Sequence, residues 1–443
     1  MIKCRCHGGK SMLKIGIHTL GCKVSQYESA AIKEELERRG YTVTDSFTGC
    51  DIQIINTCTV TAEADRKCCS AVRRAARSGA KTLVIGCMTE IDSHDLETLD
   101  NVIYVSGTAK KMKTVEIVDR IAASLPISSP ACTPADKEIF EAMSISSFDR
   151  TRAYIKVEDG CESHCSYCII PKARGKIRSK TKEDTLEEAG RLIRGGCHEI
   201  VLTGIEVDAW GRDLGVERLP ALIEAVNALP GDFRIRLGSL DPVIVDEAFC
   251  ATLSTCEKLA PHFHLSVQSG SSRTLARMRR RYNADQIYRA VSLLRAAIPG
   301  VCFTCDIIVG FPGESEEDFL ETCRLAEAIG FLHMHIFPYS KRPGTPAAEM
   351  PDQISASERK RRAALLAEIA EKKKHETVLE ALSGFPVCRV LTETKEETSI
   401  TAHDGHFIEF RIFDCYAERG EFVDVRPFAI ERGICFARPV KEL

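Results

Sequence analysis

The sequence has few aromatic residues, little net charge and no long apolar run. Its 443 residues include one Trp and carry a formal net charge of −3. A protein that coats nucleic acid uniformly would be strongly basic, so any nucleic-acid contact must be local. No apolar stretch reaches the roughly 18 residues that a membrane-spanning helix needs. The opening MIKCRCHGGKSM lacks a following apolar segment and a cleavage site, which predicts a cytoplasmic protein.

Cysteine, by contrast, is abundant. The chain has 21 cysteines, an odd number. Because the cytoplasm keeps thiols reduced, these residues do not form a disulfide framework, and cysteines that group together are expected to bind a metal or a cluster. Most of the others are expected to be small buried hydrophobic residues, and examples are Cys197, Cys250, Cys256, Cys323, Cys388 and Cys415.

Basic residues are concentrated in four runs. They are the segments 73–77, 277–281, 359–362 and 372–374. Each run could be a solvated helix face, and only a surface shared by several of them would form a phosphate-binding site.

The order of predicted strands and helices gives an α/β protein with three domains. In residues 12–125 short β runs alternate with helical patterns, which predicts a parallel sheet with covering helices. Residues 126–147 are rich in Pro and Ser and are predicted to be a linker. Residues 148–376 contain six β runs separated by helical segments, which predicts a partial (β/α)6 barrel with its active site at the carboxyl ends of the strands. Residues 377–443 predict a small OB-like β-barrel.

The central domain contains three closely spaced cysteines. Cys161, Cys165 and Cys168 follow the first predicted barrel strand directly. Three thiolates supply all but one of the four ligands that a cubane 4Fe-4S cluster needs, so one iron would stay open. Structural zinc is the alternative, with His164 as a possible fourth ligand.

Three further cysteines lie upstream. Cys22, Cys58 and Cys87 each stand at the carboxyl end of a predicted parallel strand. The carboxyl ends of neighbouring parallel strands share one edge of the sheet, so these residues are expected to meet there. Each cysteine alone could simply be buried, but together they predict a second cluster with an open iron.

The central motif, CxxxCxxC with Tyr167 before the third cysteine, resembles the signature of the radical S-adenosylmethionine superfamily. In that superfamily the open iron binds S-adenosylmethionine, and its reductive cleavage gives a 5′-deoxyadenosyl radical. The resemblance implies an electron donor such as flavodoxin or ferredoxin. The cofactor supplies the chemistry, and the protein supplies binding and orientation.

The two cysteine trios, followed by a small β-domain, resemble the methylthiotransferases over nearly the whole chain. TLGCKVSQYES is similar to the TLGCKVNQYES opening of the enzymes that act on N6-threonylcarbamoyladenosine in tRNA. Isopentenyladenosine enzymes open closer to TFGCQMN, and ribosomal-protein enzymes open with SLGCPKN. Three positions depart from the family pattern: Ser25 and Glu206, where Asn is usual, and Lys172, where Tyr is usual.

The resemblance implies a reaction. The enzyme would convert C2–H of N6-threonylcarbamoyladenosine, 3′ to the tRNA anticodon, into C2–SCH3, using two 4Fe-4S clusters and two S-adenosylmethionine molecules. One molecule would methylate sulfur held at the upstream cluster, and the other would be cleaved at the central cluster. The C-terminal domain resembles the RNA-binding TRAM module, and the reacting base would have to leave its stack in the anticodon loop. The sulfur donor is left open, and a monomer is expected.

Two other function classes remain. A methylthiotransferase could act on isopentenyladenosine or on a ribosomal-protein side chain. An RNA-binding protein could use its metal sites for structure only. Iron content together with release of 5′-deoxyadenosine distinguishes the enzyme from that binding protein.

Further site candidates lie at strand ends and beside the cysteine loop. One set of polar residues is expected to bind S-adenosylmethionine because of its position. For those of the set that lie at strand ends, capping of the strand is the alternative. The set is Tyr167, Glu206, Ser239, Gln268 and Asp306. Arg174 and Arg178 would bind a phosphate or orient the substrate, or else lie in a solvated loop. Cys302 and Cys305 have CxxC spacing within a strand and are expected to be buried.

Overall fold

The computed structural model describes residues 13–91, 96, 98–127, 139–215, 218–384 and 386–440. These residues form two compact units, which are described separately. One contains the described residues up to 127 together with residues 172–174, and the other contains the remainder. Residues 128–138 of the predicted linker lie outside the described residues. In the described part of the chain, no helix combines the length and the apolar character needed to cross a membrane.

The first unit is built on a five-stranded parallel sheet with the order β2-β1-β3-β4-β5. Its strands are β1 (Lys14–Thr19), β2 (Thr42–Thr44), β3 (Ile52–Thr57), β4 (Lys81–Gly86) and β5 (Val102–Ser106). Its helices are α1 (Lys23–Arg38), α2 (Ala62–Arg77), α3 (Cys87–Ile91) and α5 (Lys113–Ala122). The predicted parallel sheet is confirmed, although the sequence did not reveal the short strand β2 or the helices α3 and α5.

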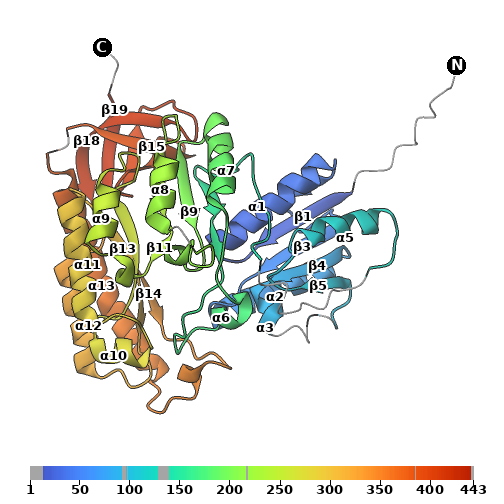
Figure 1. Cartoon of the computed structure of the whole chain (residues 1–443), viewed down its shortest axis with the longest axis horizontal. Coiled ribbons are helices and arrows are strands. Elements are labelled where there is room, and N and C mark those ends of the chain that lie inside the picture. The colour runs from blue at the N-terminus through green and yellow to red at the C-terminus, as the bar shows by residue number, and fades with distance from the viewer. Residues whose placement is uncertain are drawn as a thin grey trace. The chain divides into compact units, whose positions relative to one another are not determined.

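Helices cover both faces of this sheet (Figure 1). Ile32 of α1 and Val118 of α5 pack in one apolar cluster with strand residues such as Ile54. Val72 of α2 packs in a second cluster with Ile55, the next residue along the same strand. Since successive strand side chains point to opposite faces, the two clusters lie on the two sides of the sheet. Both faces are apolar for this reason, which is typical of parallel strands.

The second unit contains the predicted partial barrel. Parallel strands form one sheet with the order β10-β9-β6 and another with the order β11-β12-β13-β14. These strands are β6 (Ala153–Lys156), β9 (Glu199–Thr203), β10 (Arg234–Leu237), β11 (Ser239–Leu240), β12 (His262–Gln268), β13 (Cys302–Val309) and β14 (His333–Pro338). A short pair, β7 (Glu158–Asp159) and β8 (Arg178–Ser179), flanks the cysteine loop. The six β runs of the sequence are confirmed, with the third divided between β10 and β11.

Helices follow these strands in alternation, as the sequence predicts. They are α6 (Ile170–Arg174), α7 (Lys182–Arg194), α8 (Leu219–Asn227), α9 (Glu247–Ser254), α10 (Ser272–Arg277), α11 (Ala284–Ala297), α12 (Glu316–Ile329) and α13 (Ala356–Leu382). Several begin at a side chain that accepts a hydrogen bond from the first turn, such as Thr181 of α7 and Ser315 of α12. Such caps satisfy backbone N–H groups that have no partner within the helix. Figure 1 shows α11, α12 and α13 along the outer side of β13 and β14.

The C-terminal segment forms a closed five-stranded barrel with the order β15-β16-β17-β19-β18, as the OB-like prediction requires. Its strands are β15 (Cys388–Lys395), β16 (Ser399–Asp404), β17 (Glu409–Phe413), β18 (Phe422–Glu431) and β19 (Ile434–Pro439). The sequence indicated three β pieces and did not reveal β16 and β19. Val378 and Leu382 of α13 and Cys302 of β13 share the core of this barrel. The barrel therefore packs directly on the central domain.

A buried charge cluster lies where the small barrel meets the amino ends of the central strands. Glu199 accepts hydrogen bonds from Arg152 at 2.6 Å and Arg236 at 2.8 Å, and it also pairs with Arg234. Burial opposes the charge of Glu199, but the three guanidinium groups hold its pKa well below the usual range. Phe407 of the small barrel lies under the guanidinium of Arg236, 4.8 Å from the ring centre. This end of the central domain is thereby closed by paired charges and an aromatic ring.

Glu393 of the small barrel makes the stability of this junction depend on pH. Burial raises the pKa of Glu393, but His403, at 2.6 Å, and Arg152 lower it more, to about 2. A carboxyl whose pKa is lower in the folded than in the unfolded protein stabilises the fold at pH values above the unfolded pKa. This stabilisation is lost as the pH falls toward the folded pKa. We expect Glu393→Gln to lower the free energy of unfolding at pH 7 by about 2 kcal/mol.

The difference in the free energy of unfolding between this variant and the parent should disappear as the pH falls from about 4.5 to 2. In this range Glu393 itself takes up a proton. Urea unfolding at several pH values measures it. The exposed Glu376→Gln is the control, because its partner Lys373 is also on the surface. A pH-independent difference for Glu393→Gln contradicts the assigned titration.

Candidate active site

The first unit gathers its three predicted cysteine ligands at one edge of the sheet. Cys22 caps the amino end of α1 after β1, Cys58 follows β3 directly, and Cys87 begins α3 after β4. Because β1, β3 and β4 are neighbours and parallel, their carboxyl ends meet. The sheet topology thus places all three cysteines on the edge that the sequence predicted.

The acidity of the Cys58 and Cys87 thiols reflects burial and the charged groups around them. Burial, with a smaller electrostatic contribution from Cys87 and Cys22, raises the pKa of Cys58 to about 11. Burial also raises the pKa of Cys87, while the positive charges of Arg174 and Lys111 oppose this effect. Two of the three thiols therefore need a cation or metal beside them to ionise near pH 7.

A fully buried ionic network lies against Cys87. Arg174 donates from Nε to Cys87 Sγ at 3.2 Å and from Nη1 to Glu28 Oε1 at 2.7 Å. Lys111 pairs with the same glutamate and donates to Asn56 Oδ1 at 3.1 Å. None of these four polar side chains is exposed to solvent. A guanidinium facing a sulfur is suited to stabilising the thiolate form.

Cys68 supports the loop that carries Cys58. Its sulfur accepts a hydrogen bond from the Cys58 amide at 3.2 Å and approaches the Cys58 carbonyl oxygen at 3.5 Å. Cys68 lies on α2 and is fully buried. Burial raises the pKa of Cys68 to about 12, so this residue stays a thiol and acts as a structural partner.

In the second unit, backbone contacts shape the loop of Cys161, Cys165 and Cys168. The Cys161 amide donates to the Gly175 carbonyl at 3.0 Å, and the Cys168 amide donates to the Cys165 carbonyl at 3.1 Å. Gly160 has a φ of +98°, and a Cβ there would overlap the carbonyl oxygen of Lys176. Only glycine fits this close approach.

Arginines from the segment before α11 reach this loop. Arg280 donates to Cys165 Sγ at 3.1 Å and to Asp241 at 3.0 Å. Arg281 donates to Glu206 at 2.6 Å, and the Cys161 thiol donates to the same glutamate at 3.0 Å. Arg280 and Arg281 of the basic run 277–281 thus contribute to the surroundings of the loop, so the run is not simply a solvated helix face.

Carboxylates accumulate on one side of the loop. Burial, followed by the charges of Asp241 and Glu206, raises the pKa of Asp208 to about 7. Burial also raises the pKa of Glu158, whose carboxylate accepts a hydrogen bond from the Glu206 amide at 2.7 Å. Such a cluster of carboxylates is suited to a cationic ligand group, such as an ammonium or a sulfonium.

The predicted S-adenosylmethionine contacts lie in different surroundings. Glu206 is next to Cys161, whereas Asp306 lies 3.3 Å from His264 Nε2. Gln268 ends β12 with a φ of +64°, a conformation that is uncommon for a residue other than glycine. Ser239 is exposed on β11. Tyr167 packs against a core cluster, and burial raises its pKa.

Arg174 and Arg178 are both buried and paired. Arg178 lies 3.1 Å from Asp159, and Arg174 belongs to the network beside Cys87. A solvated loop is therefore excluded for either residue. A buried, paired guanidinium is also poorly placed to bind an RNA phosphate, and we propose that both arginines support the cysteine sites instead.

The donor sets of both trios fit an iron–sulfur cluster. Each trio offers three thiols, and each has an arginine within hydrogen-bond distance of one sulfur. Among the described residues, the group of three ligands compact enough for a single ion is His264, Asp306 and His335, whose ligand atoms lie within 4.8 Å of one another. Three thiolates in each trio are the ligands of a cluster with one open iron.

Several site residues were not recognised from the sequence. They are Glu28, Asn56, Lys111, Asp241, Arg280 and Arg281. A polar Asn56 inside the apolar run DIQIINT was one available signal, because a buried polar side chain requires a partner. The expected burial of Cys302 and Cys305 is confirmed.

Two family models match the chain. Residues 155–326 match the radical SAM superfamily. Residues 14–107 match a model described as uncharacterized protein family UPF0004. The two matches coincide with the segments that contain the two cysteine trios.

Curated relatives extend the likeness over most of the chain. It is 34% identical over 406 residues to "Threonylcarbamoyladenosine tRNA methylthiotransferase MtaB" of Bacillus subtilis, covering 90% of each chain. It is 38% identical to the protein of the same name from Thermotoga maritima, covering 81% of this chain and 82% of that protein. It is 35% identical to "tRNA-2-methylthio-N(6)-dimethylallyladenosine synthase" of Acetivibrio thermocellus, covering 78% and 74% respectively.

A solved structure agrees on the fold. The radical S-adenosylmethionine methyltransferase TsrM of Kitasatospora setae, with cobalamin and a [4Fe-4S] cluster bound, matches with a TM-score of 0.57. The match has 14% sequence identity and covers 76% of this chain and 77% of that one. The fold, the two matched families and the full-length relatives together show that the chain belongs to the tRNA methylthiotransferase family of radical S-adenosylmethionine proteins.

Proposed function

We propose that the protein converts N6-threonylcarbamoyladenosine, 3′ to the tRNA anticodon, into its 2-methylthio derivative. Two S-adenosylmethionine molecules and two 4Fe-4S clusters would take part. The observation that carries this proposal is the position of Cys22, Cys58 and Cys87 at three adjacent strand ends, in addition to the central motif. A second cluster with an open iron, in the same chain as a radical site, suits insertion of sulfur.

The side chains around each trio have defined tasks in this proposal. Cys161, Cys165 and Cys168 hold the cluster that, with S-adenosylmethionine, supplies a carbon radical. Arg280 stabilises the Cys165 thiolate by donating to its sulfur, and Arg174 does the same for Cys87. Glu206, which accepts a hydrogen bond from the Cys161 thiol, would accept a further one from the amino group of the methionine moiety.

The choice of nucleoside rests on the sequence of the first site. Relatives with the threonylcarbamoyladenosine name and relatives with the dimethylallyladenosine name match at similar identity. The segment TLGCKVSQYES, which contains Cys22, is more similar to the opening of the threonylcarbamoyladenosine enzymes than to that of the isopentenyladenosine enzymes. Its Ser25 is buried, with Oγ 3.9 Å from Cys22 Sγ, so it occupies the immediate surroundings of the proposed cluster.

The C-terminal barrel supplies a surface suited to RNA. Phe428 is 56% exposed and Tyr416 is 89% exposed. The Arg438 guanidinium lies 5.2 Å from the centre of the Phe428 ring. Exposed aromatic rings beside basic groups are typical of surfaces on which unpaired bases stack. We propose that this surface contacts tRNA, that a flavodoxin or ferredoxin supplies electrons, and that the protein acts as a monomer.

Nucleoside mass spectrometry tests the proposed reaction. The purified protein, reconstituted without oxygen, would be given S-adenosylmethionine, a sulfide source and a reductant. One reaction would contain tRNA bearing N6-threonylcarbamoyladenosine, and another would contain tRNA bearing isopentenyladenosine. We expect a mass increase matching replacement of H by SCH3 in the first reaction only.

Analysis of tRNA from a strain that lacks the gene provides the cellular counterpart. The 2-methylthio form of N6-threonylcarbamoyladenosine should be absent there and should return with the intact gene. Modification of the isopentenyl substrate alone would instead identify the protein as a dimethylallyladenosine enzyme. If the 2-methylthio form of N6-threonylcarbamoyladenosine persisted in the deletion strain, the proposed substrate would be refuted.

A further inference from the structure

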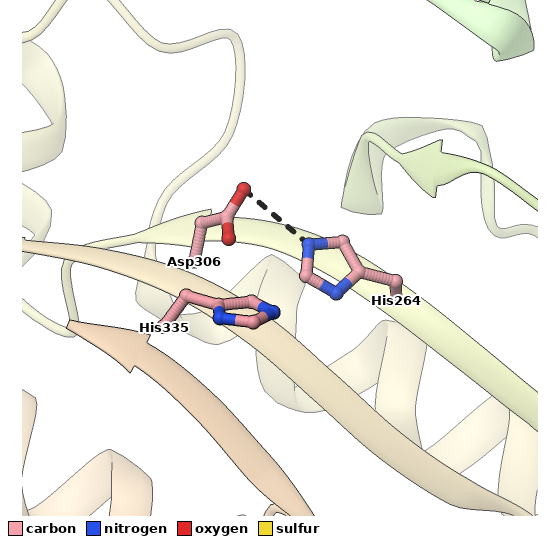
Figure 2. Close-up of side chains that lie close together, drawn as sticks. All are labelled: His264, Asp306 and His335. Atoms are coloured by element: carbon pink, nitrogen blue, oxygen red, sulfur yellow. Dashed lines mark ion pairs between the residues drawn. The ribbon is translucent and has the colours of Figure 1, made fainter. Parts of the chain in front are cut away.

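Two histidines and an aspartate converge on one face of the central sheet. His264 of β12, Asp306 of β13 and His335 of β14 come from three adjacent parallel strands (Figure 2). Asp306 and His335 are direct register partners, and His264 is the register partner of Thr304, two residues before Asp306. Their ligand atoms lie within 4.8 Å of one another, and His264 Nε2 is 3.3 Å from Asp306 Oδ2.

The opposite face of these strands is the apolar one. Leu265, Cys305 and Ile307 are fully buried there. His264 and Asp306 are half-buried and His335 is exposed. Residues that alternate with the buried positions point to the other face of the sheet, so the group has one open side.

A hydrogen bond from outside the group orients His264. Its Nδ1 lies 2.9 Å from Thr304 Oγ1, which also lies 3.0 Å from His262 Nε2. In the tautomer in which Nδ1 donates its hydrogen to Thr304 Oγ1, the other ring nitrogen presents its lone pair. The nitrogen of His264 that faces Asp306 is then a ready metal ligand.

An ordinary ion pair between His264 and Asp306 is the simpler explanation, but it does not account for a third ligand atom within 4.8 Å of both groups. Bonds of about 2.0–2.2 Å to one ion put its ligand atoms roughly 3 Å apart, as His264 and Asp306 already are. The exposed ring of His335 can complete the group by rotating about its side-chain bonds. Two imidazoles and one carboxylate with open positions are typical of a site for a divalent first-row transition metal.

We propose that His264, Asp306 and His335 bind one divalent transition-metal ion, such as Fe²⁺, Mn²⁺ or Zn²⁺, with water in its remaining positions. This site is separate from the two cysteine trios and shares no ligand with them. Its donor set of nitrogen and oxygen selects against soft ions such as Cu⁺, which thiolates prefer.

Electron paramagnetic resonance with Mn²⁺ tests the site in the complete protein. With both clusters oxidised and diamagnetic, added Mn²⁺ is the spin that is observed, and thiolates compete poorly for it. Titration should show one tight site per chain, with nitrogen couplings from imidazole. His335→Phe, which keeps a ring in place, should weaken binding at least about tenfold, and Asp306→Asn should do the same.

His333→Phe is the matched control. His333 lies on the same strand and face, with its ring centre 4.6 Å from that of His335, but it is not in the group. This variant should bind Mn²⁺ as the parent does, and thermal unfolding verifies that all variants fold. Absence of a tight site in the parent, or equal binding by His335→Phe and the parent, would overturn the proposal. Neither result bears on methylthiolation of tRNA.

Discussion

Replacing the central cysteines should abolish cleavage of S-adenosylmethionine, whereas replacing the upstream cysteines should leave it intact. The triple variant Cys161→Ala/Cys165→Ala/Cys168→Ala loses all ligands of the proposed radical cluster, so no 5′-deoxyadenosine is expected. The variant Cys22→Ala/Cys58→Ala/Cys87→Ala keeps that cluster and should still release 5′-deoxyadenosine while failing to form the methylthio product. Chromatography of the nucleoside products measures both outcomes.

Iron content gives the same prediction an independent measurement. The reconstituted parent should contain about eight irons per chain, and each triple variant about four. Cys415→Ala is the matched control, because this half-buried cysteine lies outside both trios. Cleavage by the central variant would contradict the assignment, and zinc in place of iron in the parent would support a structural metal site.

Replacing Arg174 with methionine should strongly destabilise the first unit. The guanidinium pairs with Glu28 and donates to Cys87, and all three side chains are almost fully buried. Breaking a buried ion pair while its partner stays charged typically costs about 3–5 kcal/mol. Hydrogen exchange read by mass spectrometry should show this loss as faster exchange in the peptides of β3 and β4.

The single tryptophan provides an internal control for this experiment. Trp210 is fully buried in the second unit and donates to the Lys180 carbonyl at 2.8 Å. Its fluorescence reports on that unit only. Arg38→Met on α1 is the matched variant, because Arg38 pairs with Glu35 at the surface, where an ion pair contributes little to stability. If Arg174→Met and Arg38→Met changed hydrogen exchange in the first unit equally, the Arg174 network would contribute little to the stability of that unit.

The cysteine trios and the order of the strands could be predicted from the sequence. Apolar β runs separated by helical segments leave few arrangements other than parallel sheets. Once the strands are parallel, a residue that follows a strand must lie at the carboxyl edge. Cys22, Cys58 and Cys87 could therefore be grouped although up to 65 positions separate them along the chain.

The short or irregular elements could not be predicted in this way. β2 has three residues, and β16 and β19 have six residues each. Strands of this kind depend on pairing with a neighbour more than on their own residues. The solvated loop considered for Arg174 and Arg178 is wrong, since a local pattern does not reveal a buried partner such as Glu28.

The sequence by itself determined the fold class and the two sets of cysteines, because periodicity and spacing are local properties that survive in any packing. Only the tertiary structure decided which charged groups meet. Arg280 faces Cys165 across 115 positions, Glu206 faces Cys161 across 45, and His264 faces Asp306 on the neighbouring strand. The physical reason is that side-chain pairs between distant segments depend on strand register, helix packing and rotamer, which no single stretch of sequence specifies.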